Sequence, residues 1–173
     1  MQEVWRDDII KIMEKKNSLE KIVISAGIGK FAERSQFKDK VLPEIQKDIA
    51  RITGQKPAVR QARKAISNFK TRVGDPIGLQ VTLRGRRMQD FFTRINRVVL
   101  PRVKDFRGID VKNVDHGGSL NIGFREQYVF PEIDMDRSTI SFGLQVTIVP
   151  IVKERARAID FYREEGVPLK KTK

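Results

Sequence analysis

The chain has 173 residues, 39% of them hydrophobic, which suffices for one sizeable core and matches the usual length of a single domain. Zero cysteines exclude disulfides, thiolate catalysis and cysteine-bound zinc, and a single histidine leaves little room for metal or acid–base chemistry. The formal net charge of +13 favours a polyanionic partner over the substrates of an ordinary metabolic enzyme.

The first predicted element is a short amphipathic helix, because apolar residues from Trp5 to Met13 share one helical face. A β-branched run then predicts a strand over residues 19–25. Apolar residues recur every three or four positions over residues 37–52, and Gly54 follows as a C-cap, so a helix is expected there. Residues 57–64 predict an exposed strand with basic side chains.

The second half of the chain predicts further strands and two helices. Residues 68–73 and 78–84 are expected to form the arms of a hairpin around a Gly-Asp-Pro tip. Leu79, Val81 and Leu83 alternate with polar residues, which is typical of a sheet with one buried and one open face. A helix over residues 88–99, ended by Pro101, follows. After it come two half-buried strands, over residues 119–124 and 140–148, and a final helix over residues 153–165.

These elements predict an α+β fold, a two-layer sandwich in which a mainly antiparallel sheet carries helices on one face. We expect residues 1–173 to form a single domain, with a short N-terminal helix and a loose lysine-rich tail over about residues 166–173. No segment has the apolar length to span a bilayer or the core of a signal peptide. We therefore expect a cytoplasmic protein with no membrane partner, no metal and no cofactor.

The charge is distributed unevenly along the chain. Residues 54–107 contain 14 lysines and arginines and three aspartates, which accounts for +11 of the total +13. Residues 108–152 contain three basic and six acidic residues, a net charge of −3. A charge run is often only a solvated face, but this reversal of sign favours two different neighbours for the two segments.

A glycine motif after the first predicted strand offers an enzymatic alternative. Residues 27–32 satisfy the Gly-x-Gly-x-x-Ala pattern of dinucleotide-binding folds, and Glu44 or Asp48 follows at a suitable distance for a ribose contact. Such folds need parallel strands buried on both faces, whereas most later strands here alternate and lack crossover helices. The simpler interpretation is a bulge or a close backbone approach at the two glycines.

The segment Asp115-His116-Gly117-Gly118-Ser119 contains the three residue types of a catalytic triad. The groups of a real triad converge from separate elements, so neighbours in sequence do not form one. His116 is interpreted as a loop residue close to a partner.

The basic segment combines cations with an aromatic residue and with hydroxyl and amide groups. This mixture is what RNA recognition requires, since lysine and arginine neutralise phosphates while the other groups contact bases and 2′-hydroxyls. Core packing is an equally good interpretation of Phe69. The cations of the predicted RNA site are Lys56, Arg60, Arg63, Lys64, Lys70 and Arg84.

Seven motifs occur in order along the chain: Thr53-Gly54-Gln55-Lys56-Pro57, Ala65-Ile66-Ser67-Asn68-Phe69-Lys70, Pro76-Ile77-Gly78, Val81-Thr82-Leu83-Arg84-Gly85, Leu100-Pro101-Arg102-Val103, Asp105-Phe106-Arg107-Gly108 and Phe130-Pro131-Glu132-Ile133. Together they closely resemble the bacterial family of large-subunit ribosomal protein L5, from about Leu19 to Leu169. The resemblance implies a non-enzymatic ribosomal protein, a monomer outside the ribosome, that attaches 5S rRNA to the central protuberance and contacts large-subunit rRNA.

The resemblance also assigns residues to three partners. The family contacts 5S rRNA through two amides, an aromatic residue and a threonine, which correspond here to Gln55, Phe69 and Thr82, with Ser25 standing where the first amide, an asparagine, is usual. The loop that approaches the peptidyl-site tRNA corresponds to Arg72, Val73, Gly74, Asp75, Pro76, Ile77 and Gly78. The region that bridges to a basic small-subunit protein corresponds to residues 108–136, and its charged or loop residues are Asp110, Asp115, His116, Asp134 and Asp136; His116 departs from the family's usual loop. A non-ribosomal RNA-binding module, such as a maturation factor, is the alternative.

Overall fold

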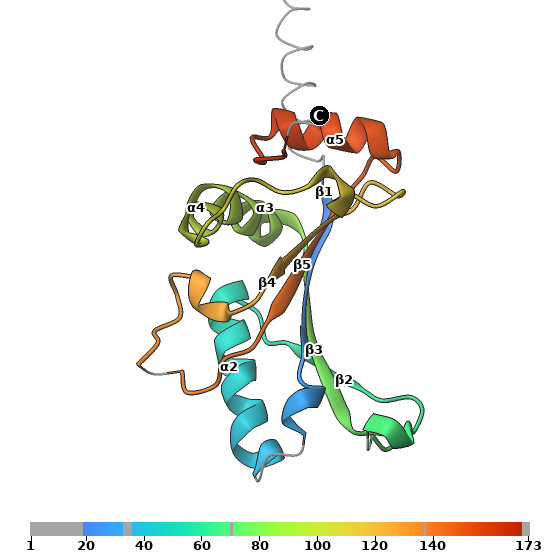
Figure 1. Ribbon diagram of the computed structural model, residues 1–173, viewed down its shortest axis with the longest axis vertical. Coiled ribbons are helices and arrows are strands. Elements are labelled where there is room, and N and C mark those ends of the chain that lie inside the picture. Colours follow the sequence, from blue (N-terminus) through green and yellow to red (C-terminus); the bar gives the residue numbers. More distant parts are fainter. Residues whose placement is uncertain (1–18, 33–35, 70, 137, 171–173) are drawn as a thin grey trace, which may run out of the picture.

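The computed structural model describes residues 19–32, 36–69, 71–136 and 138–170, and for Phe69 it describes the backbone alone. A five-stranded sheet in the order β2-β3-β1-β5-β4 forms one layer (Figure 1). Its strands are β1 (Leu19–Gly27), β2 (Ala58–Gln61), β3 (Pro76–Leu83), β4 (Leu120–Phe124) and β5 (Leu144–Pro150). All pairings between these strands are antiparallel. The helix expected near Trp5 lies outside the described residues.

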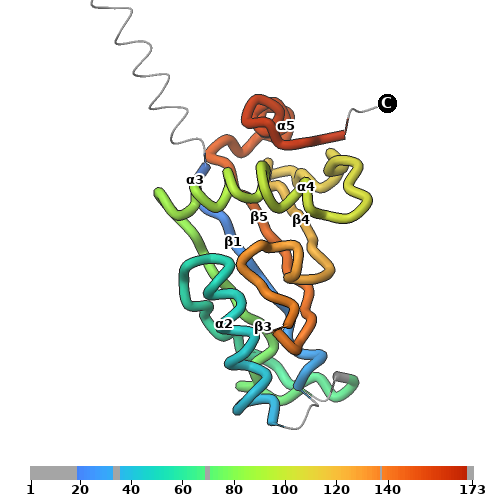
Figure 2. The backbone as a smooth tube through the Cα atoms, turned by 90° about the vertical axis from the view of Figure 1, so that its left-hand side faces the viewer, coloured from blue at the N-terminus to red at the C-terminus, as the bar shows by residue number. Residues whose placement is uncertain are grey.

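The helices α2 (Leu42–Thr53), α3 (Gly85–Arg94) and α4 (Leu100–Arg102) lie on one side of the sheet. The π-helical turns η2 (Phe37–Val41) and η4 (Ile95–Val99) lead into α2 and α4. The last helix, α5 (Arg155–Glu164), lies at one end of the sheet, and the loop between β2 and β3 lies at the other (Figures 1 and 2). The predicted α+β sandwich with helices on one face is therefore confirmed.

The core lies between the sheet and its helices, as the alternation in the strands predicts. Leu79, Val81 and Leu83 of β3 are buried, and the residues between them are only partly covered. Ile22 and Ile24 of β1 are likewise no more than 1% exposed. Full burial of such a side chain contributes about 1.5–3 kcal/mol. Because the apolar side chains of each strand are buried on the helix side, the alternate side chains point to the other face of the sheet.

The hairpin that ends in β3 differs from its prediction. β3 pairs with β2, and the hydrogen bonds from Ala62 N–H to Asp75 O and from Gly74 N–H to Ala62 O extend this pairing toward the tip. The described residues of 68–73, a segment expected as a strand, lie in the tip instead, because a pair of backbone hydrogen bonds between Ile66 and Thr71 closes a tight turn there. The basic exposed strand expected over residues 57–64 is the true partner arm.

Two boundaries also differ from the sequence prediction. The helix expected to stop at Pro101 continues to Arg102, because the preceding π-helical turn changes the hydrogen-bond pattern and Pro101 then stands in the first turn of α4. The last strand begins at Leu144 and not at Ile140. Ile140 and Phe142 are nevertheless buried, so the apolar alternation continued into an irregular segment that packs on the core.

The C-terminal helix is fixed to the sheet by a buried tyrosine. The Tyr162 hydroxyl lies 2.9 Å from Gly118 O and 3.0 Å from Ile148 O, and these two carbonyls share its single proton. Burial raises the pKa of Tyr162, so the hydroxyl keeps the proton that these bonds require. Gly118 has a φ of +81°, and a Cβ there would stand 2.8 Å from Ala158 Cβ, so only glycine fits under α5.

Residues after α5 are held more firmly than the expected loose tail. Val167 is 4% exposed, and hydrogen bonds run from Ile109 N–H to Pro168 O and from Lys170 N–H to Ile109 O. Backbone pairing of this kind orders the chain up to Lys170. No helix in the described part of the chain is long and apolar enough to cross a membrane.

Candidate nucleic-acid interface

The sheet face that carries no helix presents uncharged polar side chains in rows across the strands. Ser25 of β1 pairs with Gln80 of β3 on one side and with Gln145 of β5 on the other. Two positions along β1, Val23 lies between Thr82 and Thr147. Residues directly opposite in neighbouring strands point to the same face. These amides and hydroxyls therefore form one continuous surface, which we call the open face.

The β4 and β5 half of the open face is organised by its own hydrogen bonds. Asn121 Oδ1 accepts from Gln145 Nε2 at 3.0 Å and from Thr147 Oγ1 at 2.7 Å. The Asn121 carbonyl is thereby occupied, and its amide N–H groups stay available to a ligand. Gln145 keeps its Oε1 as an acceptor. The surface thus offers donors and acceptors in a fixed arrangement without any charge.

The structure assigns Thr82 to this open face, as the alternation in β3 predicts, and it also places Ser25 there. Gln80, which lies beside Ser25 in the row, accepts a 2.7 Å hydrogen bond from Arg60 Nε. Gln55 lies outside the sheet, three residues before Ala58, which pairs with Gln80. Its backbone N–H and carbonyl are both held by the Thr53 hydroxyl, so the α2 to β2 connection has a fixed path.

Two of the predicted cations, Arg60 and Arg84, border the open face at β2 and β3. Lys56, Arg60, Arg63 and Lys64 are exposed. Arg84 follows β3 directly and donates to the backbone carbonyl of Glu20, 3.3 Å away. Phosphates that approach the open face from this side would meet positive charge first. Lys70 and the side chain of Phe69 lie outside the described parts of the molecule, so the contact expected of them stays a prediction.

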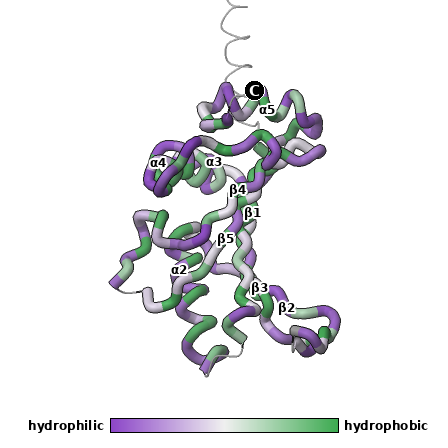
Figure 3. Tube along the Cα trace, in the orientation of Figure 1, coloured by the Kyte–Doolittle hydropathy of each residue, from purple (hydrophilic) through white to green (hydrophobic). Residues whose placement is uncertain are grey.

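The predicted tRNA-proximal loop is a compact turn followed by the start of β3. Arg72 N–H donates to Asp75 Oδ2 at 2.7 Å, and Asp75 N–H donates to Arg72 O at 3.2 Å. Gly74 has a φ of +89°, which favours glycine, and Val73 is 69% exposed. Pro76, Ile77 and Gly78 belong to β3. Figure 3 shows hydrophilic and hydrophobic residues mixed along this tip.

The structure separates the five predicted bridge residues into two loops. Asp110, Asp115 and His116 are exposed in the connection beside α5, where Arg155 donates to the carbonyls of Val114 and Val111. Asp134 and Asp136 are exposed in the connection between β4 and β5. We call this connection, residues 125–143, the strap. A partner that contacts all five residues must therefore span two sites.

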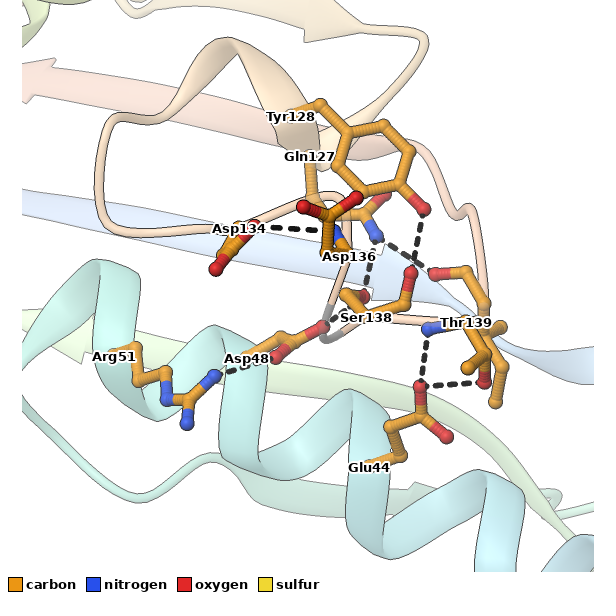
Figure 4. Close-up of polar contacts among 10 residues, drawn as sticks. Glu44, Asp48, Arg51, Gln127, Tyr128, Asp134, Asp136, Ser138 and Thr139 are labelled. Carbon is orange, nitrogen blue, oxygen red and sulfur yellow. Dashed lines mark hydrogen bonds and ion pairs between the residues drawn. The ribbon is translucent and has the colours of Figure 1, made fainter.

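The strap is fastened to α2 by a buried polar network (Figure 4). Ser138 Oγ donates to Asp48 Oδ2 at 2.6 Å, and Thr139 donates to Glu44 Oε1 through both its N–H and its hydroxyl. Gln127, fully buried, donates to Ser138 Oγ and Ile140 O and accepts from Phe142 N–H. Glu44 and Asp48, the residues considered for a ribose contact, are thus structural.

The other enzymatic motifs are also structural. Ile28, between the two glycines of the Gly-x-Gly motif, donates its N–H to Ile77 O, and Gly29 opens a short 3-10 turn, η1 (Gly29–Phe31). Asp115 Oδ1 accepts from Ser119 N–H and shapes the turn around His116. In the described part of the chain, no three His, Asp or Glu residues are grouped so as to hold a metal ion.

Sequence reasoning missed Asn121, Gln145 and Thr147 as candidates for the interface. The signal was present, since each alternates with buried residues of β4 or β5 in the same manner as Thr82 in β3. What the sequence did not reveal is the pairing of β5 with β1, which aligns them with Ser25.

Comparison with known proteins identifies the family of this chain. The family model "Ribosomal protein L5" matches residues 13–72, and the model of the C-terminus of the same ribosomal family matches residues 76–169. The chain belongs to the ribosomal protein L5 family. Among its relatives, the large ribosomal subunit protein uL5 of Halothermothrix orenii is 39% identical over 97% of both chains. The uL5 proteins of Rubrobacter xylanophilus and Thermus aquaticus are 44% and 42% identical over 88% of this chain and 83% and 82% of theirs.

Membership of the L5 family confirms the resemblance inferred from the seven motifs. It also confirms that the chain is not an enzyme, because the family consists of ribosomal proteins. The dinucleotide alternative is wrong, since the strands described here are antiparallel and the glycine motif opens no long helix.

Proposed function

We propose that this chain, a large-subunit protein of the bacterial ribosome and hence of the cytoplasm, binds 5S rRNA through its open face and attaches it to the central protuberance. The observation that carries the proposal is the row of Gln80, Ser25 and Gln145 across three adjacent strands, with no helix over it. Amide and hydroxyl groups on an uncovered sheet suit the base edges and 2′-hydroxyls of folded RNA.

The distribution of charge supports an RNA ligand with a defined orientation. The centre of the open face is uncharged, so the contacts made there depend on hydrogen-bond pattern and shape. The cations lie at the β2 and β3 side, where Arg60 and Arg84 border the row of amides and hydroxyls. The RNA backbone would cross this side while bases or riboses reach the strands.

The experiment is a filter-binding comparison of 5S rRNA with tRNA and with an unrelated RNA of equal length. We expect the protein to prefer 5S rRNA. The double variant Thr82→Ala with Gln145→Ala removes open-face groups and should weaken 5S rRNA binding by about tenfold, since each lost hydrogen bond contributes about 0.5–1.5 kcal/mol. Equal affinity for all three RNAs would contradict the proposal.

The matched control is Thr93→Ala with Gln46→Ala, on α3 and α2. These residues are of the same types but lie on helices, on the other side of the sheet. The control should bind 5S rRNA as the unchanged protein does. A loss equal to that of the open-face variant would remove the open face as the RNA site.

The hairpin tip and the acidic loops are proposed to have the other two roles. The rigid turn at Arg72 to Asp75, at the end of the molecule remote from α5, is suited to approach the peptidyl-site tRNA. The loops that carry Asp110 and Asp134 are suited to face a basic small-subunit protein. Residues 19–170 share one core cluster, and we propose that they act as one folded unit, monomeric outside the ribosome.

A further inference from the structure

A groove lies at the far end of the sheet, between the turns that follow β1 and the tip of the hairpin. Its volume is about 1050 Å³, and its walls include Phe37 and Lys38 of η2 on one side and Arg63 and Lys64 on the other. Ile77 also lines it. Ile77 alternates with Gly78 and Gln80, so it points away from the open face, toward the helix side of β3. The groove is therefore a different surface from the open face.

Among the described residues that line the groove, cations outnumber carboxylates. Lys30, Lys38, Arg63 and Lys64 line it, together with a single carboxylate, Asp75. Asp75 Oδ2 already accepts from the Arg72 N–H. Within the described residues, Lys38, Arg63 and Lys64 take part in no ion pair. Like charges held close together repel one another until an anion arrives.

The groove also exposes apolar side chains. Seven large hydrophobic residues are well exposed in the described part of the chain, and four of them fall between residues 59 and 77. Two of these, Ile66 at 49% and Ile77 at 40%, line the groove, and the amide of Asn68 stands among them. A surface selected only for solubility would not concentrate such side chains among lysines. Cations, apolar surface and an amide together match the phosphate, face and edge of a nucleotide.

We propose that this groove binds one or two unpaired nucleotides of an RNA single strand. The bases lie against Ile66 and Ile77, and the phosphates lie beside Lys38, Arg63 and Lys64. Sites of about 300–1000 Å³ hold organic ligands of this size. A paired base keeps its faces stacked inside a duplex and cannot offer one to the isoleucines, which favours single-stranded RNA. The proposal goes beyond the proposed function: Arg63, Lys64 and Ile77 are also expected near 5S rRNA or tRNA, but the groove on the helix side of β3 is a separate site for unpaired nucleotides.

The probe is an eight-nucleotide single-stranded RNA with 2-aminopurine at a central position. The full chain is titrated into it, and the change in 2-aminopurine fluorescence measures binding. The double variant Ile66→Ser with Ile77→Ser should weaken binding by about tenfold and abolish most of the change in fluorescence. The control is Val98→Ser, because Val98 is also 40% exposed but lies in η4, among the helices. The control should bind as the unchanged protein does.

A second variant keeps the test decisive if serine disturbs β3. Lys38→Glu with Lys64→Glu changes only exposed side chains and should weaken binding of the same probe by at least about tenfold. Its control, Lys47→Glu with Lys112→Glu, makes the same change of charge on α2 and on the loop before β4, and should have a much smaller effect. A blunt-ended duplex of the same length should compete poorly.

Comparing the groove variants with the open-face variant shows which of the two surfaces binds the probe. If Thr82→Ala with Gln145→Ala weakens binding of the eight-nucleotide probe and the groove variants do not, the groove proposal is overturned. Equal competition by the duplex would also overturn it. If the probe binds as expected but 5S rRNA is not preferred over other RNAs, the proposed function fails while the groove remains.

Discussion

The hairpin, residues 58–83, and the strap each connect or contain strands of the sheet, but they use their polar residues in opposite ways. The strap buries Gln127 and Ser138, which together with the exposed Thr139 hold the chain to α2 and to itself. Its Glu132 pairs with Arg94 at 2.6 Å. In the hairpin, the cations Arg63 and Lys64 point to solvent. Polar residues in a connection therefore indicate a partner only when they make no hydrogen bonds or ion pairs within the fold.

The largest expected effect is that of salt on RNA binding by the basic segment, residues 54–107, which contains the hairpin. The +11 segment should neutralise several phosphates, so raising salt from about 50 to about 200 mM should weaken 5S rRNA binding by roughly 10²–10³-fold. Filter binding over a salt series measures this slope. A flat response would mean that the cations of residues 54–107 are a solvated face like any other.

The second prediction concerns the strap. Gln127→Ala should lower the free energy of unfolding by about 3 kcal/mol, because Ile140 O and Phe142 N–H lose their buried partner. Urea denaturation measures this change. Gln145→Ala, an exposed glutamine of β5, should cost less than about 1 kcal/mol. If both variants lost the same free energy of unfolding, the hydrogen bonds of Gln127 would stabilise the fold no more than those of the exposed Gln145.

The third prediction concerns Phe69. A base stacked on this ring is worth about 1–3 kcal/mol, so Phe69→Ala should weaken 5S rRNA binding by roughly one to two decades and leave the fold intact. Phe69→Leu preserves apolar volume without the aromatic face and should lose most of the same affinity. Full binding by the leucine variant, or unfolding of the alanine variant, would make Phe69 a packing residue.

The smallest expected effect is at Arg125, in the strap. Arg125→Glu should change 5S rRNA binding by less than about twofold, because the net-acidic segment is assigned to other neighbours. The same holds for Arg137, which lies outside the described residues. Loss of 5S rRNA binding in either variant would show that our division of the surface is wrong.

Local pattern predicted much of the fold and half of the open face. Alternation in β3 assigned Thr82 to the open side, and the apolar period with Gly54 predicted α2 with its C-cap. The strand partners could not be predicted in this way, since pairing depends on groups far apart in sequence. Ser25 of β1 meets Gln145 of β5, from the opposite end of the chain, and no local signal carries that register.

Sequence analysis also failed to predict the strap's attachment to α2 and the groove, because both depend on residues that are far apart in sequence. Asp48 looked like a ribose contact or a solvated helix residue, yet its Oδ2 accepts from Ser138, 90 positions away. The groove combines η2 with the hairpin tip, which sequence analysis considered separately. Charge counts identified the most basic third of the chain but could not say which of its cations share one surface.

The strand order also affects how the protein is made. β1 emerges early in synthesis, yet it lies between β3 and β5, and β5 begins only at Leu144. Until β5 emerges, the edge of β1 toward β5 keeps unpaired backbone groups, and the row through Ser25 is missing its Gln145. The row of Gln80, Ser25 and Gln145 is therefore completed only after β5 has been made, whereas the groove contains only residues that precede β4.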